Sequence, residues 1–140
     1  MYTIDQLSLM TGLTTRTLRN YLKGDILHGE KENGIWRFSE EQVQAFLEHP
    51  AVRPSIRAKH HGIVYDFLAG QNRHENEMCF LLDRAMEERE AKQIADFFCH
   101  AVAPLSHVRF AYSYESGTAR YILKGAEEDI RRILQSLYAG

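Results

Sequence analysis

This sequence of 140 residues has little that would indicate disulfide bonds, membrane spans or a secretion signal. Its two cysteines are too few for a disulfide framework and fit a reducing compartment. No run of about 18 apolar residues occurs, so a membrane span is not expected. The first residues, MYTIDQLS, lack the basic flank and apolar run of a secretory signal. We therefore expect a cytoplasmic protein without a membrane partner.

The patterns of common active sites are also missing. There is no phosphate-binding glycine loop, no convincing Ser/His/Asp or Cys/His arrangement and no close carboxylate pair. Cys79, Cys99, His100 and His107 could meet in space as ligands for a soft metal, but they show no CxxC or HxxxH spacing. Buried free cysteines are the expectation. We expect no catalytic residues, no cofactor and no bound metal.

Positive charge is concentrated in one short stretch. The formal net charge is −2, and the 44% hydrophobic and 26% charged content is ordinary for a globular protein. The stretch from Thr14 to Lys23 nevertheless holds Arg16, Arg19 and Lys23 and no acid. One basic face on a weakly acidic protein favours a specific nucleic-acid binder over a sequence-independent coater of DNA.

Two short helices separated by a tight turn are predicted at the start of the chain. Thr3 and Gln6 form a capping-box pair for the first helix. Gly12 supplies the positive φ that ends it, and Thr14 or Thr15 caps the second helix. The buried stripe of the second helix comprises Leu18, Tyr21 and Leu22.

A hairpin and a third helix follow. The Asn33-Gly34 pair predicts a tight hairpin turn, and residues 35–38 alternate as its return strand. Ser39 and Gln42 form a second capping box. Residues 49–55 are predicted as a linker. Ser55 then caps a helix whose apolar face comprises Ile56, His60, Ile63, Val64, Phe67 and Leu68.

The rest of the chain has the order strand, helix, hairpin, helix. Met78–Leu82 is predicted as a central strand. A two-residue loop at Ser116-Gly117 would pair Tyr112 with Tyr121, and this places every large apolar group but Ile122 on one face. The order predicts a three-stranded sheet with helices on one face.

The two faces of this sheet carry different side chains. The aromatic stripe is interpreted as the core face under the helices, with an effector pocket as the alternative; it comprises Phe110, Tyr112, Tyr114 and Tyr121. The other face is interpreted as solvated, with a partner surface or an anion site as alternatives; it carries Arg109, Ser113, Arg120, Ile122 and Lys124.

Together these elements predict an α+β fold in three parts. Residues 1–49 form a winged helix-turn-helix, which we call the N-terminal module. Residues 50–70 form a linker and helix, and residues 71–140 form a small βαββα domain for dimerisation or effector binding.

The polar side chains of the N-terminal module suit DNA. An α-helix fits the major groove, where Arg pairs with guanine and Asn with adenine. Basic residues of the hairpin suit the phosphate backbone, which positions a protein on the duplex. The candidate DNA-binding residues are Thr14, Thr15, Arg16, Thr17, Arg19, Asn20, Tyr21, Lys23, Lys31, Trp36 and Arg37.

Residues 2–49 resemble the winged helix-turn-helix of the MerR family of bacterial transcription regulators, and also the smaller excisionase-type modules. The residues that carry the resemblance are Tyr2-Thr3-Ile4, Leu7, the run from Thr11 to Arg19, Tyr21, Ile26-Leu27, Gly34 and Trp36-Arg37-Phe38. The resemblance implies that helix 15–23 enters the major groove of double-stranded DNA and that the wing at residues 28–38 touches the backbone.

Two other functions stay open. The module could be an architectural or adaptor protein of excisionase type, or a protein-interaction module on a helix-turn-helix scaffold. We also expect a homodimer, because helix-turn-helix proteins commonly bind paired half-sites. An effector or RNA polymerase is a further possible partner.

Overall fold

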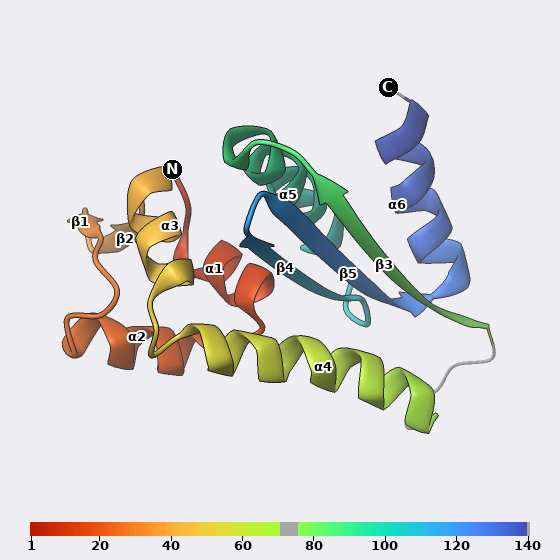
Figure 1. The fold of residues 1–140 in the computed structure, drawn as a ribbon, viewed down its shortest axis with the longest axis horizontal. Helices are drawn as coiled ribbons and strands as arrows, with labels where there is room; N and C mark the ends of the chain where they lie inside the picture. The colour runs from red at the N-terminus through yellow and green to blue at the C-terminus, as the bar shows by residue number, and fades with distance from the viewer. Residues whose placement is uncertain (71–75, 140) are drawn as a thin grey trace.

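The computed structural model describes residues 1–70 and 76–139. Its elements follow the order α1 (Ile4–Thr11), α2 (Thr15–Lys23), β1 (Glu30–Glu32), β2 (Ile35–Arg37), α3 (Glu40–Glu48), α4 (Arg53–Ala69), β3 (Glu77–Ala85), α5 (Glu88–Val102), β4 (Arg109–Glu115), β5 (Thr118–Ala126) and α6 (Glu127–Ala139). A helical N-terminal module is followed by a small sheet domain (Figure 1), which confirms the predicted α+β class.

The helix ends of the N-terminal module form as their capping residues predict. The backbone N–H of Gln6 donates to Thr3 Oγ1 at 3.1 Å, and the N–H of Thr3 donates to Gln6 Oε1 at 2.9 Å. Gly12 ends α1 with a φ of 78°. Ser39 and Gln42 repeat the same reciprocal box at α3. Both capping boxes are therefore confirmed.

The β1–β2 hairpin turns at the predicted Asn33-Gly34 pair. Asn33 and Gly34 have φ values of 50° and 80°, the left-handed conformation that such a turn requires. The base of the hairpin is fixed to the start of the chain, because Tyr2 and Phe38 exchange backbone hydrogen bonds of 2.8 and 2.9 Å. The hairpin and α1 are thus held together at a buried position.

Helix α4 begins earlier than predicted. It starts at Arg53 with Pro54 in its first turn, and no side chain caps it, so the prediction that Ser55 is the N-cap is wrong. Proline is tolerated there because the first N–H groups of a helix have no intrahelical partner. The prediction for Leu68 is also wrong: this side chain is 76% exposed, so the buried face ends before it.

The sheet has the strand order β3-β5-β4, with both pairs antiparallel. The predicted two-residue hairpin loop is confirmed, since Tyr112 pairs with Tyr121. Strand β3 lies at an edge, so the prediction that Met78–Leu82 forms the central strand is wrong. Its apolar run is explained by helices on both sides of the sheet, which partly bury alternate side chains in either direction.

Helices α5 and α6 cover one face of the sheet. Phe98 of α5 packs against Phe110 and Tyr121 with ring centroids 5.3 Å apart in each pair. Tyr112 is also fully buried. The aromatic stripe is therefore core, as interpreted from the sequence.

Helix α4 crosses the opposite face, which corrects the prediction of a solvated surface. Ile63 of α4 forms a small buried cluster with Ala111 and Ile122. Arg109 of β4 pairs with Asp66 of α4 at 2.8 Å. Ile122, the apolar exception on this face, is the residue that α4 covers.

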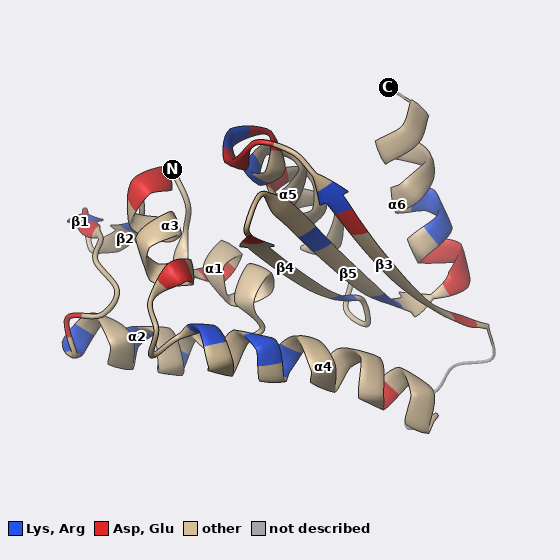
Figure 2. Ribbon diagram, viewed as in Figure 1, with Lys and Arg blue, Asp and Glu red and all other residues tan. Residues whose placement is uncertain are grey.

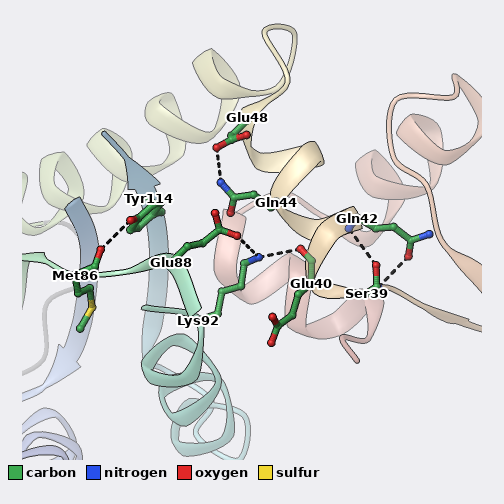
Figure 3. A network of polar contacts seen from close by, with 9 residues as sticks. All are labelled: Ser39, Glu40, Gln42, Gln44, Glu48, Met86, Glu88, Lys92 and Tyr114. Atoms are coloured by element: carbon green, nitrogen blue, oxygen red, sulfur yellow. Dashed lines mark hydrogen bonds and ion pairs between the residues drawn. The ribbon is translucent and has the colours of Figure 1, made fainter. Parts of the chain in front are cut away.

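The N-terminal module is joined to the sheet domain by direct contacts. Helix α1 lies along β4, and one buried core continues from the module into the sheet. Lys92 of α5, which is 2% exposed, donates from Nζ to the backbone carbonyl of Glu40 in α3 at 2.9 Å and pairs with Glu88 at 2.8 Å (Figure 3). These contacts join α1 and α3 of the N-terminal module to the sheet domain.

Candidate nucleic-acid interface

Helix α2 presents polar side chains outward over a buried apolar anchor. Leu18 is fully buried, whereas the long polar groups of the helix are exposed. The exposed groups are Arg16, Arg19, Asn20 and Lys23. With no acid in the helix, this face has positive charge and hydrogen-bond donors at helical spacing, which suits phosphates and base edges.

The N-terminus of α2 uses one of the candidate DNA-binding residues as its cap. Thr14 Oγ1 accepts from the Thr17 N–H at 3.1 Å, and the two threonine hydroxyls lie 3.0 Å apart. Thr15 is the first residue of the helix. The role of Thr14 in the fold is therefore to start α2, and Thr15 and Thr17 lie in the first turn beside Arg16.

The turn between α1 and α2 is fixed by side-chain hydrogen bonds. Ser8 Oγ donates to the Leu13 carbonyl at 2.7 Å, and the Leu13 N–H donates to Thr11 Oγ1 at 3.1 Å. Leu13 itself is buried between the helices. Both backbone polar groups of Leu13 are therefore hydrogen-bonded within the turn, although the residue is buried.

Tyr21 has a mixed role at the inner edge of α2. Its ring meets Phe46 of α3 edge-on, with centroids 5.5 Å apart and planes at 68°. The residue is half-buried, so its ring contributes to the core of the module. Its hydroxyl lies on the same helix as the exposed basic residues.

The hairpin brings two of its predicted residues, Lys31 and Trp36, into contact. Lys31 pairs in register with Trp36, and its Nζ lies 5.6 Å from the centroid of the indole ring, a cation–π distance. Trp36 stacks on Phe38 with centroids 6.4 Å apart. Arg37 is opposite Glu30 in the register. The hairpin therefore offers Lys31 and Arg37 as cations.

Basic residues that sequence reasoning missed lie on α4. Figure 2 shows Lys and Arg on α2 and on the first half of α4, along the same lower edge of the view. The Cβ of Lys59 lies 3.0 Å from the position that a Cβ on Gly12 would take, so α4 passes the α1–α2 turn closely. Arg53 and Arg57 pair with Glu115. The sequence signal was available, since residues 49–65 contain no acid.

The cysteines do not gather with one another. Cys99 lies in the main core, where burial raises the pKa of its thiol to about 12. Cys79 lies on the other face of the sheet, beside the small cluster under α4. Within residues 1–70 and 76–139, no three His, Cys, Asp or Glu side chains are placed to hold a metal ion. In the same ranges, no helix is long and apolar enough to cross a bilayer.

The geometry of residues 2–48 is that of a helix-turn-helix whose second helix is exposed and basic. These residues match the family model described as MerR HTH family regulatory protein. The N-terminal module is therefore a MerR-like helix-turn-helix, the module of a DNA-binding regulatory family. Comparisons with curated proteins and with solved structures found no match.

Proposed function

We propose that this protein is a sequence-specific DNA-binding transcription regulator that places α2 in the major groove. The observation that carries the proposal is the acid-free, exposed face of α2, which lies over the buried Leu18 and follows a hydrogen-bonded turn. A groove-reading helix needs this combination, because direct readout requires fixed donors at the base edges.

Individual roles follow from exposure and chemistry. Arg16, in the first turn, and Asn20, one turn later, are the base-contacting candidates for guanine and adenine. Arg19 and Lys23 neutralise phosphates, and the hydroxyl of Tyr21 reaches the backbone. Thr15 and Thr17 offer methyl and hydroxyl groups to the first base pairs.

The hairpin acts as a wing on the adjacent backbone. Lys31 and Arg37 supply the phosphate contacts, and the indole ring of Trp36 makes a cation–π contact with the ammonium group of Lys31. We add Lys59, exposed beside the α1–α2 turn, as a phosphate contact from α4. These contacts position the module and carry no sequence information themselves.

Self-association completes the proposal. Regions 1–49, 50–70 and 71–140 serve as DNA-binding module, linking helix and dimerisation or effector domain. Tyr65 and Leu68 of α4 are 66% and 76% exposed, and large apolar groups so exposed suit a second copy of the chain. A homodimer would bind two half-sites in the cytoplasm. If light scattering finds a monomer both free and on DNA, the proposed homodimer is wrong.

One observation favours a second function. Glu30 and Glu32 are exposed on β1, on both sides of Lys31, where they would repel phosphates. This arrangement suits a protein-interaction module, or an architectural protein of excisionase type that binds DNA beside a protein partner. Affinity for DNA that falls steeply with salt argues for DNA contact and against the interaction module.

A selection experiment tests the main proposal. The full chain is used to enrich sites from random duplexes, and fluorescence anisotropy then measures affinity for the enriched site. Arg16→Ala and Arg19→Ala should each weaken binding about tenfold or more. Arg132→Ala, which removes an exposed arginine from α6, is the matched control. If both α2 variants bind like the control, α2 is not the DNA-reading helix.

A further inference from the structure

A cavity of about 240 Å³ lies between α4 and the sheet face that it crosses. This volume is below the roughly 300–1,000 Å³ of pockets that hold drug-sized ligands, so it suits a small metabolite. The cavity is separate from the exposed face of α2 and from the β1–β2 hairpin, and none of the proposed DNA contacts lines it.

One end of the cavity is apolar. Leu81 and Ile122 are partners in the β3–β5 register and therefore stand side by side on this face. Val64 of α4 lines the same end and packs against the cluster that contains Ile122. Ile122 is buried, whereas Leu81 is 48% exposed at the sheet edge. An apolar group about the size of one side chain would complete the cover of this end.

The next rows of the sheet carry charge of both signs. Asp83 and Arg120 are also register partners, joined by hydrogen bonds of 2.7 and 2.8 Å. Arg57 of α4 reaches Glu115 of β4 at 2.7 Å. The Ser113 hydroxyl lies in the same row as Arg120. The four charged groups that line the cavity present two carboxylates and two guanidiniums to one small volume, and Arg53, outside the lining, also pairs with Glu115 at 3.1 Å.

The side chain of His60 also lines the cavity, and it carries a buried nitrogen without a partner behind this wall. Its side chain is 4% exposed, and its Nε2 is buried without a hydrogen-bond partner. Burial, aided by the nearby charges of Arg120 and His61, lowers the pKa of this imidazole to about 4, so the ring is neutral. Hydrogen bonding of the ring to the Met10 backbone uses its N–H, which leaves Nε2 as an acceptor. A buried acceptor of this kind needs a donor.

We propose that this cavity binds a small zwitterion with an apolar tail, of the type represented by the apolar α-amino acids. The carboxylate would share the guanidiniums of Arg57 and Arg120, and the ammonium would share the carboxylates of Asp83 and Glu115. The tail would lie on the apolar end. Only a ligand with both charges is complementary to these four groups. An anion alone would be repelled by the two carboxylates, and a cation alone would be repelled by the two guanidiniums.

The existing ion pairs do not block this ligand. The side chains of Arg120 and Asp83 are 44% and 42% exposed, and ion pairs so exposed to water contribute little to stability. Arg120 uses Nε and Nη2 toward Asp83, so a guanidinium N–H remains for a second carboxylate. Sharing these groups therefore costs little.

The position of the cavity connects it to the N-terminal module. Arg57 and His60 belong to α4, the helix that passes the α1–α2 turn at Lys59. A ligand that shares Arg57 and Glu115 would change how α4 rests on β4, along which α1 lies. The expected consequence is a change in DNA affinity, and this second step rests on the proposed function.

Ligand binding is measured first, without DNA. The full chain, labelled with ¹⁵N, is titrated with L-leucine, L-methionine and L-phenylalanine, and amide shifts are followed by NMR. We expect at least one to saturate, with shifts centred on Ser113, Arg120 and Ile122. Isoamylamine and 4-methylpentanoate each lack one charge of L-leucine, so they should bind at least tenfold more weakly than the amino acid.

Variants separate the cavity from adventitious binding. Arg120→Gln and Asp83→Asn should each weaken binding at least tenfold, and Ser113→Leu should abolish it by filling the cavity. Arg132→Gln, which removes an ion pair on α6, should bind like the parent. The parent-like spectrum of each variant outside the cavity shows that it folds. No saturable shift with any of the three amino acids would overturn the proposal, as would equal binding by the single-charge analogues. A chain that binds the amino acid but no DNA would refute the proposed function alone.

Discussion

Lys92 on α5 donates a hydrogen bond of 2.9 Å from its buried ammonium group to the backbone carbonyl of Glu40, the first residue of α3. This bond crosses from the sheet domain to the N-terminal module. The aliphatic part of the side chain is buried as well, since Lys92 is 2% exposed. The packing of α3 on the sheet domain thus depends on a residue far from it in the sequence.

Replacing Lys92 separates its apolar contribution from its polar one. Lys92→Ala removes three buried methylene groups and leaves a cavity, so the free energy of unfolding should fall by about 2–4 kcal/mol. Lys92→Met keeps most of the buried volume and loses only the polar contacts. It should cost about 1 kcal/mol, because removing a buried charge also removes its desolvation penalty. Urea unfolding of both variants measures this difference. Equal losses would show that the ion pair, and not the buried stem, stabilises this junction.

Acid should destabilise the protein through His60. The pKa of its imidazole is about 4 in the folded protein and 6.5 for an ordinary solvated histidine, so the unfolded chain binds a proton between these values while the folded chain does not. The contribution of the neutral His60 to the free energy of unfolding is therefore fully present above about pH 6.5, and it is lost as the pH falls toward 4. Between pH 7.5 and 4.5 the parent should lose about 2 kcal/mol more than His60→Leu. Asp96, whose pKa is raised by burial, acts in the opposite sense but is common to both proteins. Parallel pH profiles would rule out this role of His60.

Two glycines should respond to alanine in opposite directions. A Cβ on Gly29 would lie 2.5 Å from the ring of Phe38 and 2.9 Å from the carbonyl of Arg37. Gly29→Ala should therefore lower the melting temperature, with a loss of about 1–3 kcal/mol. A Cβ on Gly62, inside α4, would meet nothing within 4 Å. Gly62→Ala should raise stability by about 1 kcal/mol through helix propensity. Calorimetry on the pair checks both signs.

Local features of the fold could be predicted from the sequence, because they depend on neighbouring residues. The capping box at Thr3 and Gln6 and the turn at Asn33-Gly34 are decided within four residues, and both are confirmed. The edge position of β3 and the course of α4 depend on distant partners and could not be predicted in this way. Ile122 was the available clue, since a large apolar group on an otherwise polar face implies a cover.

In the candidate interface, too, some residues could be predicted from the sequence and others depend on tertiary contacts. The exposed face of α2 follows from helical periodicity around Leu18, so its residues could be named in advance. For Lys59 the sequence shows only that residues 49–65 contain no acid, because its place beside the α1–α2 turn is a tertiary contact.

Phosphate contacts from the hairpin and α4 should be separable from base contacts. Arg37→Ala and Lys59→Ala should weaken binding to enriched and scrambled duplexes by similar factors. Each should also reduce the slope of log affinity against log salt by about one. Anisotropy titrations at four salt concentrations give these slopes. An unchanged slope for Lys59→Ala would remove α4 from the interface, while an unchanged slope for Arg37→Ala would remove the hairpin.

The most direct test of the central claim is the specificity ratio of Arg16→Ala. The dissociation constant is measured on the enriched site and on a scrambled duplex at one salt concentration, for the parent and the variant. If α2 reads bases, the variant should lose roughly 10- to 100-fold on the enriched site and much less on the scrambled one. Equal losses on both duplexes, or no loss on either, would contradict the assignment of α2 as the DNA-reading helix.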